Sequence, residues 1–129
     1  MTVMPPGETS PADALGSMLL VPGGGPSVVE WLQRLPGVVR QPGRRRRWGA
    51  DEPDTVLVGS WRVGPTRDGV LAELVSGGVT VQSRAVTGLP AGALLAEVIA
   101  QHAAQLPRSQ QEEIGVEIAV LQEIAAAGR

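Results

Sequence analysis

The stretch from Thr55 to Val86 constrains the fold most, because it has the composition and the turns of an antiparallel sheet. Its three apolar runs are TVLVGSWRV, VLAELV and VTVQSRAV, rich in Val, Leu, Thr and Trp, which suit a half-buried pleated surface. Between them stand GPTRDG and SGG, which carry the Gly, Pro and Asp of turns. We therefore expect a three-stranded antiparallel β-meander over about residues 55–86, with the rest of the chain folded around it.

The turns also predict a register for this sheet. Gly77-Gly78 fits a two-residue type I′ turn, because glycine reaches the positive φ that both central positions need. Such a turn pairs Leu74 with Val81, and the GPTRDG loop pairs Val63 with Val70. Period-two alternation then predicts one core face, made of Leu57, Trp61, Val63, Val70, Ala72, Leu74, Val79, Val81 and Ala85. The apolar residues left on the opposite face, which favour cover by another element or a partner, are Val56, Val58, Leu71 and Val75.

Two short helices are expected before the sheet. Ser10-Pro11-Ala12-Asp13 has the residues of a helix start, with Ser as N-cap, Pro at the first helical position and Asp at the third. The glycines at 23–25 lack the Lys-Ser/Thr of a phosphate-binding loop and indicate a plain turn. After them, the capping box Ser27–Glu30 opens a second helix that ends near Leu35.

Two longer helices are expected after the sheet. Residues 91–106 carry apolar side chains at helical spacing, and Pro107 ends that helix. The capping box Ser109–Glu112 then opens a last helix to about Ala127, antiparallel to its neighbour in an αα-hairpin. The predicted fold is one α+β domain over residues 10–129, in the order α-α-β-β-β-α-α, after a flexible terminus of residues 1–9.

Composition excludes several classes of function. The 129 residues contain no Cys, which rules out thiolate nucleophiles, iron–sulfur clusters and a disulfide framework. A single His leaves too few imidazoles for a zinc site of the usual kind. The formal net charge of −2 gives no general attraction to nucleic acids or anionic lipids. We therefore expect no metal, no cofactor and no membrane partner.

Residue usage also indicates a source and a compartment. All eleven basic residues are Arg, and Phe and Tyr are absent, as is typical of GC-rich bacterial genomes of actinobacterial style. No apolar run approaches the roughly 20 residues that span a bilayer. The N-terminal MTVMPPGETS lacks the basic region of a signal peptide. A cytoplasmic bacterial protein is the expectation.

Residues 38–54 form the longest stretch without a clear element, and they contain a basic, aromatic run: Arg44, Arg45, Arg46, Arg47 and Trp48. Four guanidinium groups beside an indole can bind phosphates and stack on a base. The acidic residues that follow, Asp51, Glu52 and Asp54, reduce the local positive field. A solvated or locally ion-paired loop is the favoured interpretation, and contact with an acidic protein partner or with nucleic acid are the alternatives.

The last helix offers a second candidate surface. Apolar residues repeat there at spacings of four, three and four, at Ile114, Ile118, Leu121 and Ala125. The stripe is too short for a coiled coil. It can cover the sheet or pair with its copy in a second chain.

No catalytic constellation stands out. His102, the only imidazole, lies on or beside the apolar stripe of residues 91–106, where a packed histidine is favoured over a general base. Ser60 and Ser83 do not sit in sharp strand-to-helix turns of the nucleophile-elbow kind. An enzyme is therefore a lesser alternative.

The leading hypothesis is a non-catalytic interaction or adaptor protein that self-associates. One alternative is a nucleic-acid-associated protein that uses Arg44–Arg47 and Trp48. The element order over about Val56–Leu106 is similar to that of small bacterial nucleoid-associated proteins of the YbaB type, which implies a three-stranded sheet between helices; no residue motif accompanies the resemblance. A third possibility is a small-molecule binder with a pocket between sheet and helices, lined by Trp61.

Overall fold

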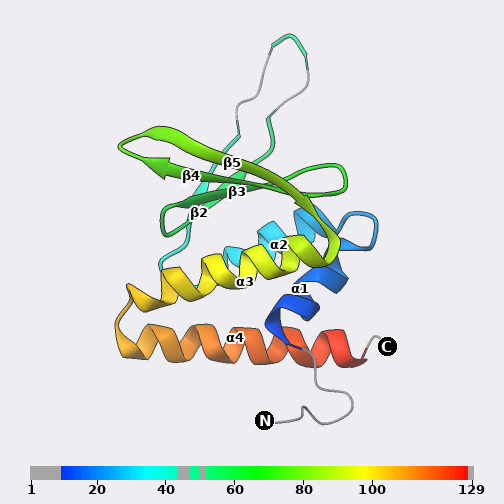
Figure 1. Ribbon diagram of the computed structural model, residues 1–129, viewed down its shortest axis with the longest axis vertical. Helices are drawn as coiled ribbons and strands as arrows, with labels where there is room; N and C mark the ends of the chain where they lie inside the picture. The colour runs from blue at the N-terminus through cyan, green and yellow to red at the C-terminus, as the bar shows by residue number, and fades with distance from the viewer. Residues whose placement is uncertain (1–9, 44–46, 50–51, 128–129) are drawn as a thin grey trace.

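Helices pack on one face of an antiparallel sheet in the computed structural model, which describes residues 10–43, 47–49 and 52–127 (Figure 1). The element order is α1 (Pro11–Leu19), α2 (Gly24–Leu32), β1 (Val39–Gln41), β2 (Thr55–Val58), β3 (Trp61–Pro65), β4 (Gly69–Ser76), β5 (Val79–Thr87), α3 (Gly88–Ala104) and α4 (Arg108–Ala127). The sheet forms one layer, α1, α2 and α3 form a second beneath it, and α4 lies beyond them (Figure 1). The α+β class and the C-terminal helix pair match the prediction.

The sheet has five strands in the order β1-β2-β3-β4-β5, not the three that the sequence predicted. One added strand comes from residues 55–63, which the sequence analysis treated as a single strand. They form a hairpin instead, because Gly59 adopts a φ of 62° and reverses the chain between Val58 and Trp61. The other added strand is β1, which lies inside the stretch expected to be irregular and pairs with β2.

The hairpin at Gly59 inverts the predicted face of β2. Val56 and Val58 are buried in the core, whereas Leu57 pairs with Arg62 on the face away from the helices. The prediction for β2 was wrong because a two-residue turn shifts the alternation relative to a continuous strand. Val63 was placed correctly, and so were Val70 and Ala72, all three fully buried.

The β3–β4 register differs from the prediction without changing the faces. Val63 pairs with Ala72 and not with Val70, a shift of two residues. Since side chains alternate with a period of two, the same residues still point toward the core. Thr66 closes the connecting loop, because its amide donates to the Gly69 carbonyl at 2.9 Å.

A bulge alters the β4–β5 pairing. Gly77 and Gly78 have φ of 58° and 80°, and Ser76 pairs with Val79, as predicted for a type I′ turn. An irregularity between Leu74 and Val75 then moves every later pair by one residue. Val86, in place of the predicted Ala85, therefore packs against the core. Val79 and Val81 were predicted to be buried, but they are 63% and 59% exposed.

The structure confirms the predicted start of the first N-terminal helix but not that of the second. The Ser10 hydroxyl accepts the Asp13 amide at 3.1 Å, which confirms the predicted N-cap. The second helix begins at Gly24, not at Ser27, whose hydroxyl donates to the Gly23 carbonyl inside the first turn at 3.1 Å. Two of the glycines predicted to form a plain turn, Gly24 and Gly25, are the first residues of this helix, and a Cβ on Gly24 would overlap the Met18 carbonyl oxygen.

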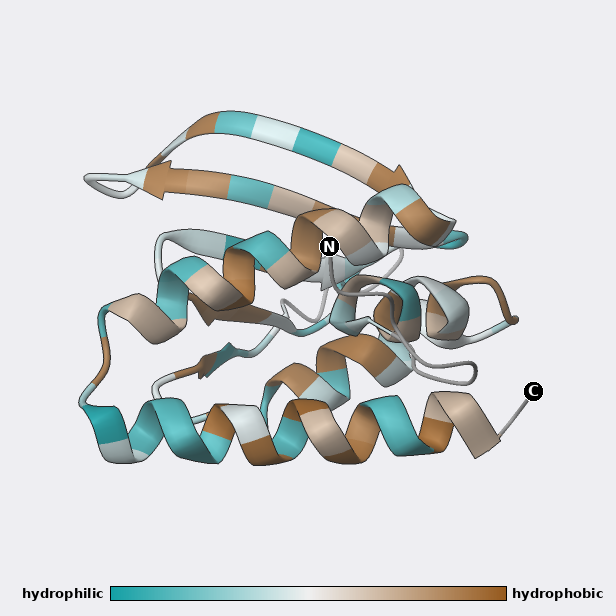
Figure 2. Ribbon diagram, turned by 60° about the horizontal axis from the view of Figure 1, so that its bottom comes forward, coloured by the Kyte–Doolittle hydropathy of each residue, from teal (hydrophilic) through white to brown (hydrophobic). Residues whose placement is uncertain are grey.

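The last two helices form the expected antiparallel pair. α4 begins at Arg108, one residue before the Ser109 expected as its cap. Brown, apolar segments recur along α4 at the bottom of Figure 2, and Ile114 and Leu121 are buried. This helix packs against α1 and α3 and not against the sheet. None of the helices in the described part of the chain is long and apolar enough to cross a bilayer.

Candidate interaction site

The arginine-rich loop connects β1 to β2 and rises from the side of the sheet that faces away from the helices (Figure 1). Trp48, in its described part, is 85% exposed, more than any other large apolar residue that the structure describes. Arg47 is exposed beside it. The other predicted residues of this run, Arg44, Arg45 and Arg46, lie outside the described residues. An indole is usually well buried, so an exposure this high beside a guanidinium group is unusual.

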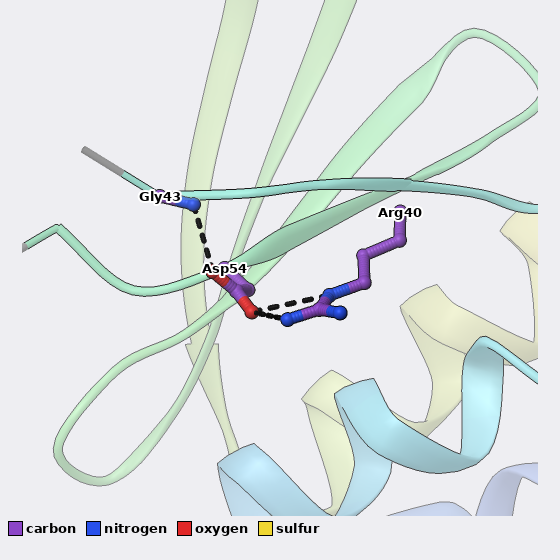
Figure 3. Close-up of polar contacts among 3 residues, drawn as sticks. All are labelled: Arg40, Gly43 and Asp54. Atoms are coloured by element: carbon purple, nitrogen blue, oxygen red, sulfur yellow. Dashed lines mark hydrogen bonds and ion pairs between the residues drawn. The ribbon is translucent and has the colours of Figure 1, made fainter. Parts of the chain in front are cut away.

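The loop has two arms, the segment that follows β1 and the segment that precedes β2. Asp54, in the second arm, connects the two at the base of the loop (Figure 3). Its Oδ1 accepts the amide of Gly43 at 2.8 Å. Its Oδ2 accepts Nε of Arg40 at 3.1 Å and also Nη2 of the same guanidinium group. Both carboxylate oxygens are therefore engaged. The ion pair at the base of the loop joins Asp54 to Arg40, which precedes the predicted arginine run.

The backbones of the two arms lie in close contact at the base of the loop. A Cβ on Gly43 would overlap the carbonyl oxygen of Glu52 and lie 2.6 Å from the carbonyl carbon of Pro53. Only a glycine lets the two arms approach so closely. The ring of contacts formed by Arg40, Gly43 and Asp54, which we name the neck, fixes where the loop leaves the sheet.

A hollow of about 930 Å³ lies between the neck and the outer face of the sheet. Arg62, Leu71 and Glu73 contribute its sheet side. Nε of Arg62 donates to Oε1 of Gln41 at 3.1 Å, which links β3 to the end of β1 across the intervening β2. Charged side chains of both signs and the apolar Leu71 thus line the surface next to the loop.

The apolar stripe predicted on the last helix packs against the core of its own chain. Ile114 and Leu121 are buried, and Ile118 and Ala125 pack against the same core. Another row of apolar residues faces outward on α4 at spacings of four, Val116, Val120 and Ile124. This row was not predicted as a separate surface, although its i, i+4, i+8 spacing is visible in the sequence.

The last strand of the sheet is open along one edge. β5 pairs with β4 alone among the described strands, and eight of its nine residues are exposed, all but Val86. Its first five residues, Val79–Ser83, carry no charge. A long uncharged edge strand offers unpaired backbone groups to another strand. In a meander the final strand must be an edge, so the sequence contained this signal.

Comparison with known protein families shows which family this chain belongs to. A family model described as a domain of unknown function (DUF5073) matches residues 7–123. The chain belongs to the DUF5073 family. The match includes every strand of the DUF5073 sheet and extends through most of α4. Searches of curated proteins and of solved structures returned no match. The five strands of this sheet differ from the three-stranded arrangement on which the resemblance to YbaB-type proteins rested.

His102 of this DUF5073 chain lies in the core, 5% exposed. Its Nε2 donates to the carbonyl of Pro36 at 2.8 Å, since a carbonyl oxygen only accepts. Its ring lies between Gly37 and Gly59, because a Cβ on either glycine would come within 3.7 Å of a ring nitrogen. No serine or carboxylate hydrogen-bonds to it in the described part of the chain. The same residues hold no cluster of three His, Cys, Asp or Glu side chains suited to a metal.

Proposed function

We propose that this DUF5073 protein is a non-catalytic interaction protein whose Arg47–Trp48 loop contacts an acidic partner protein. The observation that carries the proposal is the 85% exposure of Trp48 above a neck that Asp54 holds closed. Trp and Arg dominate the binding energy of protein interfaces. A loop with a fixed base loses less conformational entropy on binding than a free one.

The charges of the loop support an acidic partner. Four arginines in a row precede Trp48, and the nearest described carboxylates follow it in the opposite arm. Asp54 binds Arg40 of β1, so its carboxylate pairs with a guanidinium group at the neck. Carboxylates of a partner would form charge-assisted pairs with the guanidinium groups while an apolar side chain packs on the indole.

Fluorescence anisotropy with a labelled peptide of alternating Glu and Leu residues tests the proposal. Trp48→Ala should weaken binding about 30-fold, the loss expected when a hot-spot residue worth about 2 kcal/mol is removed. Leu20→Ala is the matched control, because it removes another exposed apolar side chain away from the loop. Equal affinities of the wild type and Trp48→Ala would refute the assignment.

Nucleic acid remains the second candidate, favoured by the juxtaposition of Arg47 with an exposed indole on which a base can stack. Labelled duplex and single-stranded oligonucleotides in the same assay distinguish the two. Phosphate binding falls steeply with salt, with a slope set by the number of contacts. The loop would be assigned to nucleic acid by one result: the wild type binds oligonucleotide but not peptide at physiological salt, and replacing Arg44–Arg47 by Gln abolishes that binding. Arg67→Gln is the matched control.

Self-association is the second part of the proposal, and β5 is the element that supports it. An antiparallel edge strand is self-complementary, so two copies can pair through a twofold axis and continue the sheet. The uncharged run Val79–Ser83 lacks the lysines and prolines that usually block such edges. The outward row on α4 is a weaker candidate, because Glu113, Glu117 and Glu123 flank it and would repel their copies.

A further inference from the structure

A groove of about 500 Å³ opens between α3 and the helix-facing side of the sheet, away from the arginine-rich loop. Its floor includes Val58 and Val98, and Trp61 pairs with Leu74 across β3 and β4 to form one wall. The β4–β5 hairpin and α3 diverge from the junction of β5 with α3, as both ribbon views show (Figures 1 and 2). We propose that this groove binds a small, uncharged aromatic molecule that carries a hydrogen-bond donor.

The volume and the lining suit a small ligand. Sites for small molecules usually have volumes of about 300–1,000 Å³, apolar walls and a few polar groups. Trp61 and Leu74 are half-buried and both line the groove, and Trp61 also packs against the core. An indole prefers another aromatic ring, in offset or edge-to-face contact.

His102 supplies the polar group that selects a donor. Its Nε2 is occupied by the Pro36 carbonyl, so in the neutral ring Nδ1 is an acceptor. Nδ1 lies beside Gly59, whose Cβ, if present, would be 3.7 Å away, and both residues line the groove. Within the described residues, no hydrogen bond reaches Nδ1 although the side chain is 95% buried. Buried polar atoms are normally hydrogen-bonded, so the site favours a ligand with a hydroxyl or N–H group.

The absence of formal charge among the described lining residues sets the charge of the ligand. The polar members besides His102 are Ser60, Gln101 and Gln105, all neutral. A buried carboxylate or ammonium group needs an opposite charge to offset its lost hydration. The groove offers none, so an uncharged ligand fits better than an ionised one. This inference is independent of the function proposed for the loop.

Nuclear magnetic resonance titration of the ¹⁵N-labelled full chain tests this site with two probes, indole and 1-methylindole. They differ by one N–H donor. Indole should shift the Trp61 side-chain N–H and the backbone amide of Gln101. The methylated probe should bind about fivefold more weakly, the loss of one hydrogen bond. Equal affinities would overturn the role of His102, and no shift of these groups up to the solubility of indole would overturn the site.

A pair of variants on α3 separates this groove from adsorption elsewhere. Ala104 is exposed and lines the groove, so Ala104→Leu should fill it and abolish the indole shifts. Ala100 is exposed on the same helix and does not line the groove, so Ala100→Leu should leave the affinity unchanged. Circular dichroism checks that both variants keep their helices. Unchanged indole binding by folded Ala104→Leu would refute the proposed location.

Discussion

Asp54 accepts the backbone amide of Gly43 at 2.8 Å across eleven residues of sequence, and the same carboxylate binds Arg40. The hydrogen bond closes the arginine-rich loop at its base, so the loop leaves the sheet from a fixed point. The residues at the loop tip could be singled out from the sequence, whereas the contacts of the neck are visible only in the structure. It also predicts which substitutions should loosen the loop without unfolding the domain.

Asp54→Ala should open the neck while leaving the fold intact. The ion pair with Arg40 is largely solvent-exposed, so its loss costs at most about 1 kcal/mol. Limited trypsin digestion measures the effect, because cleavage after Arg44–Arg47 requires a locally open chain. A rise in cleavage rate of about fivefold is expected. Glu112→Ala removes the exposed pair with Arg108 on α4 and should leave loop cleavage unchanged; equal rates for Asp54→Ala and wild type would contradict the neck.

Replacing Trp48 should remove the most solvent-exposed tryptophan fluorescence. The chain has three tryptophans, of which Trp31 is buried, Trp61 is half-buried and Trp48 protrudes. Trp48→Phe should shift the emission maximum to shorter wavelength and lower the quenching constant for acrylamide. Trp61→Phe is the comparison, and it should change quenching less. A larger effect from Trp61→Phe would show that Trp48 is covered in solution.

Replacing a glycine by alanine should lower the free energy of unfolding where the glycine is crowded and raise it where an exposed helical glycine has free space around it. A Cβ on buried Gly24 would overlap the Met18 carbonyl, so Gly24→Ala should lower the free energy of unfolding by about 1–3 kcal/mol. Gly115 in α4 has no atom within 4 Å of such a Cβ, so Gly115→Ala should raise it by about 0.5–1 kcal/mol. Urea unfolding measures both. A neutral Gly24→Ala would mean that α1 and α2 are not packed this closely.

A charge on β5 should abolish self-association. Val81 is exposed beside the bulge of the edge strand, and Val81→Lys places a positive charge on each of two pairing edges. Light scattering on a sizing column should give the mass of a monomer for this variant and of a dimer for the wild type. Val116→Lys is the matched control, because Val116 is 62% exposed on α4. The reverse result would assign the interface to α4, and a monomeric wild type would remove self-association altogether.

The candidate site was predictable only in part. Trp48 was singled out from residue type alone, because four guanidinium groups beside an indole can bind phosphates and stack on a base. The neck was not predictable, since Arg40 and Asp54 are fourteen residues apart and meet only because β1 pairs with β2. A pocket between sheet and helices, lined by Trp61, was one of the alternatives that the sequence left open. The orientation of His102 depends on the carbonyl of Pro36, sixty-six residues away.

Several elements of this fold are specified by residues close together in the sequence. Ser10 caps α1, Gly77 and Gly78 form the tight turn, and residues 91–106 are helical, because each depends on neighbours a few residues away. Tertiary structure decided the rest. Strand β1 forms only because it pairs with β2 across the arginine-rich loop, and packing against the helices selects the sheet face that the Gly59 turn and the bulge beside Val75 bury. Such long-range contacts decided which valines are buried and which face of α4 packs inside the chain.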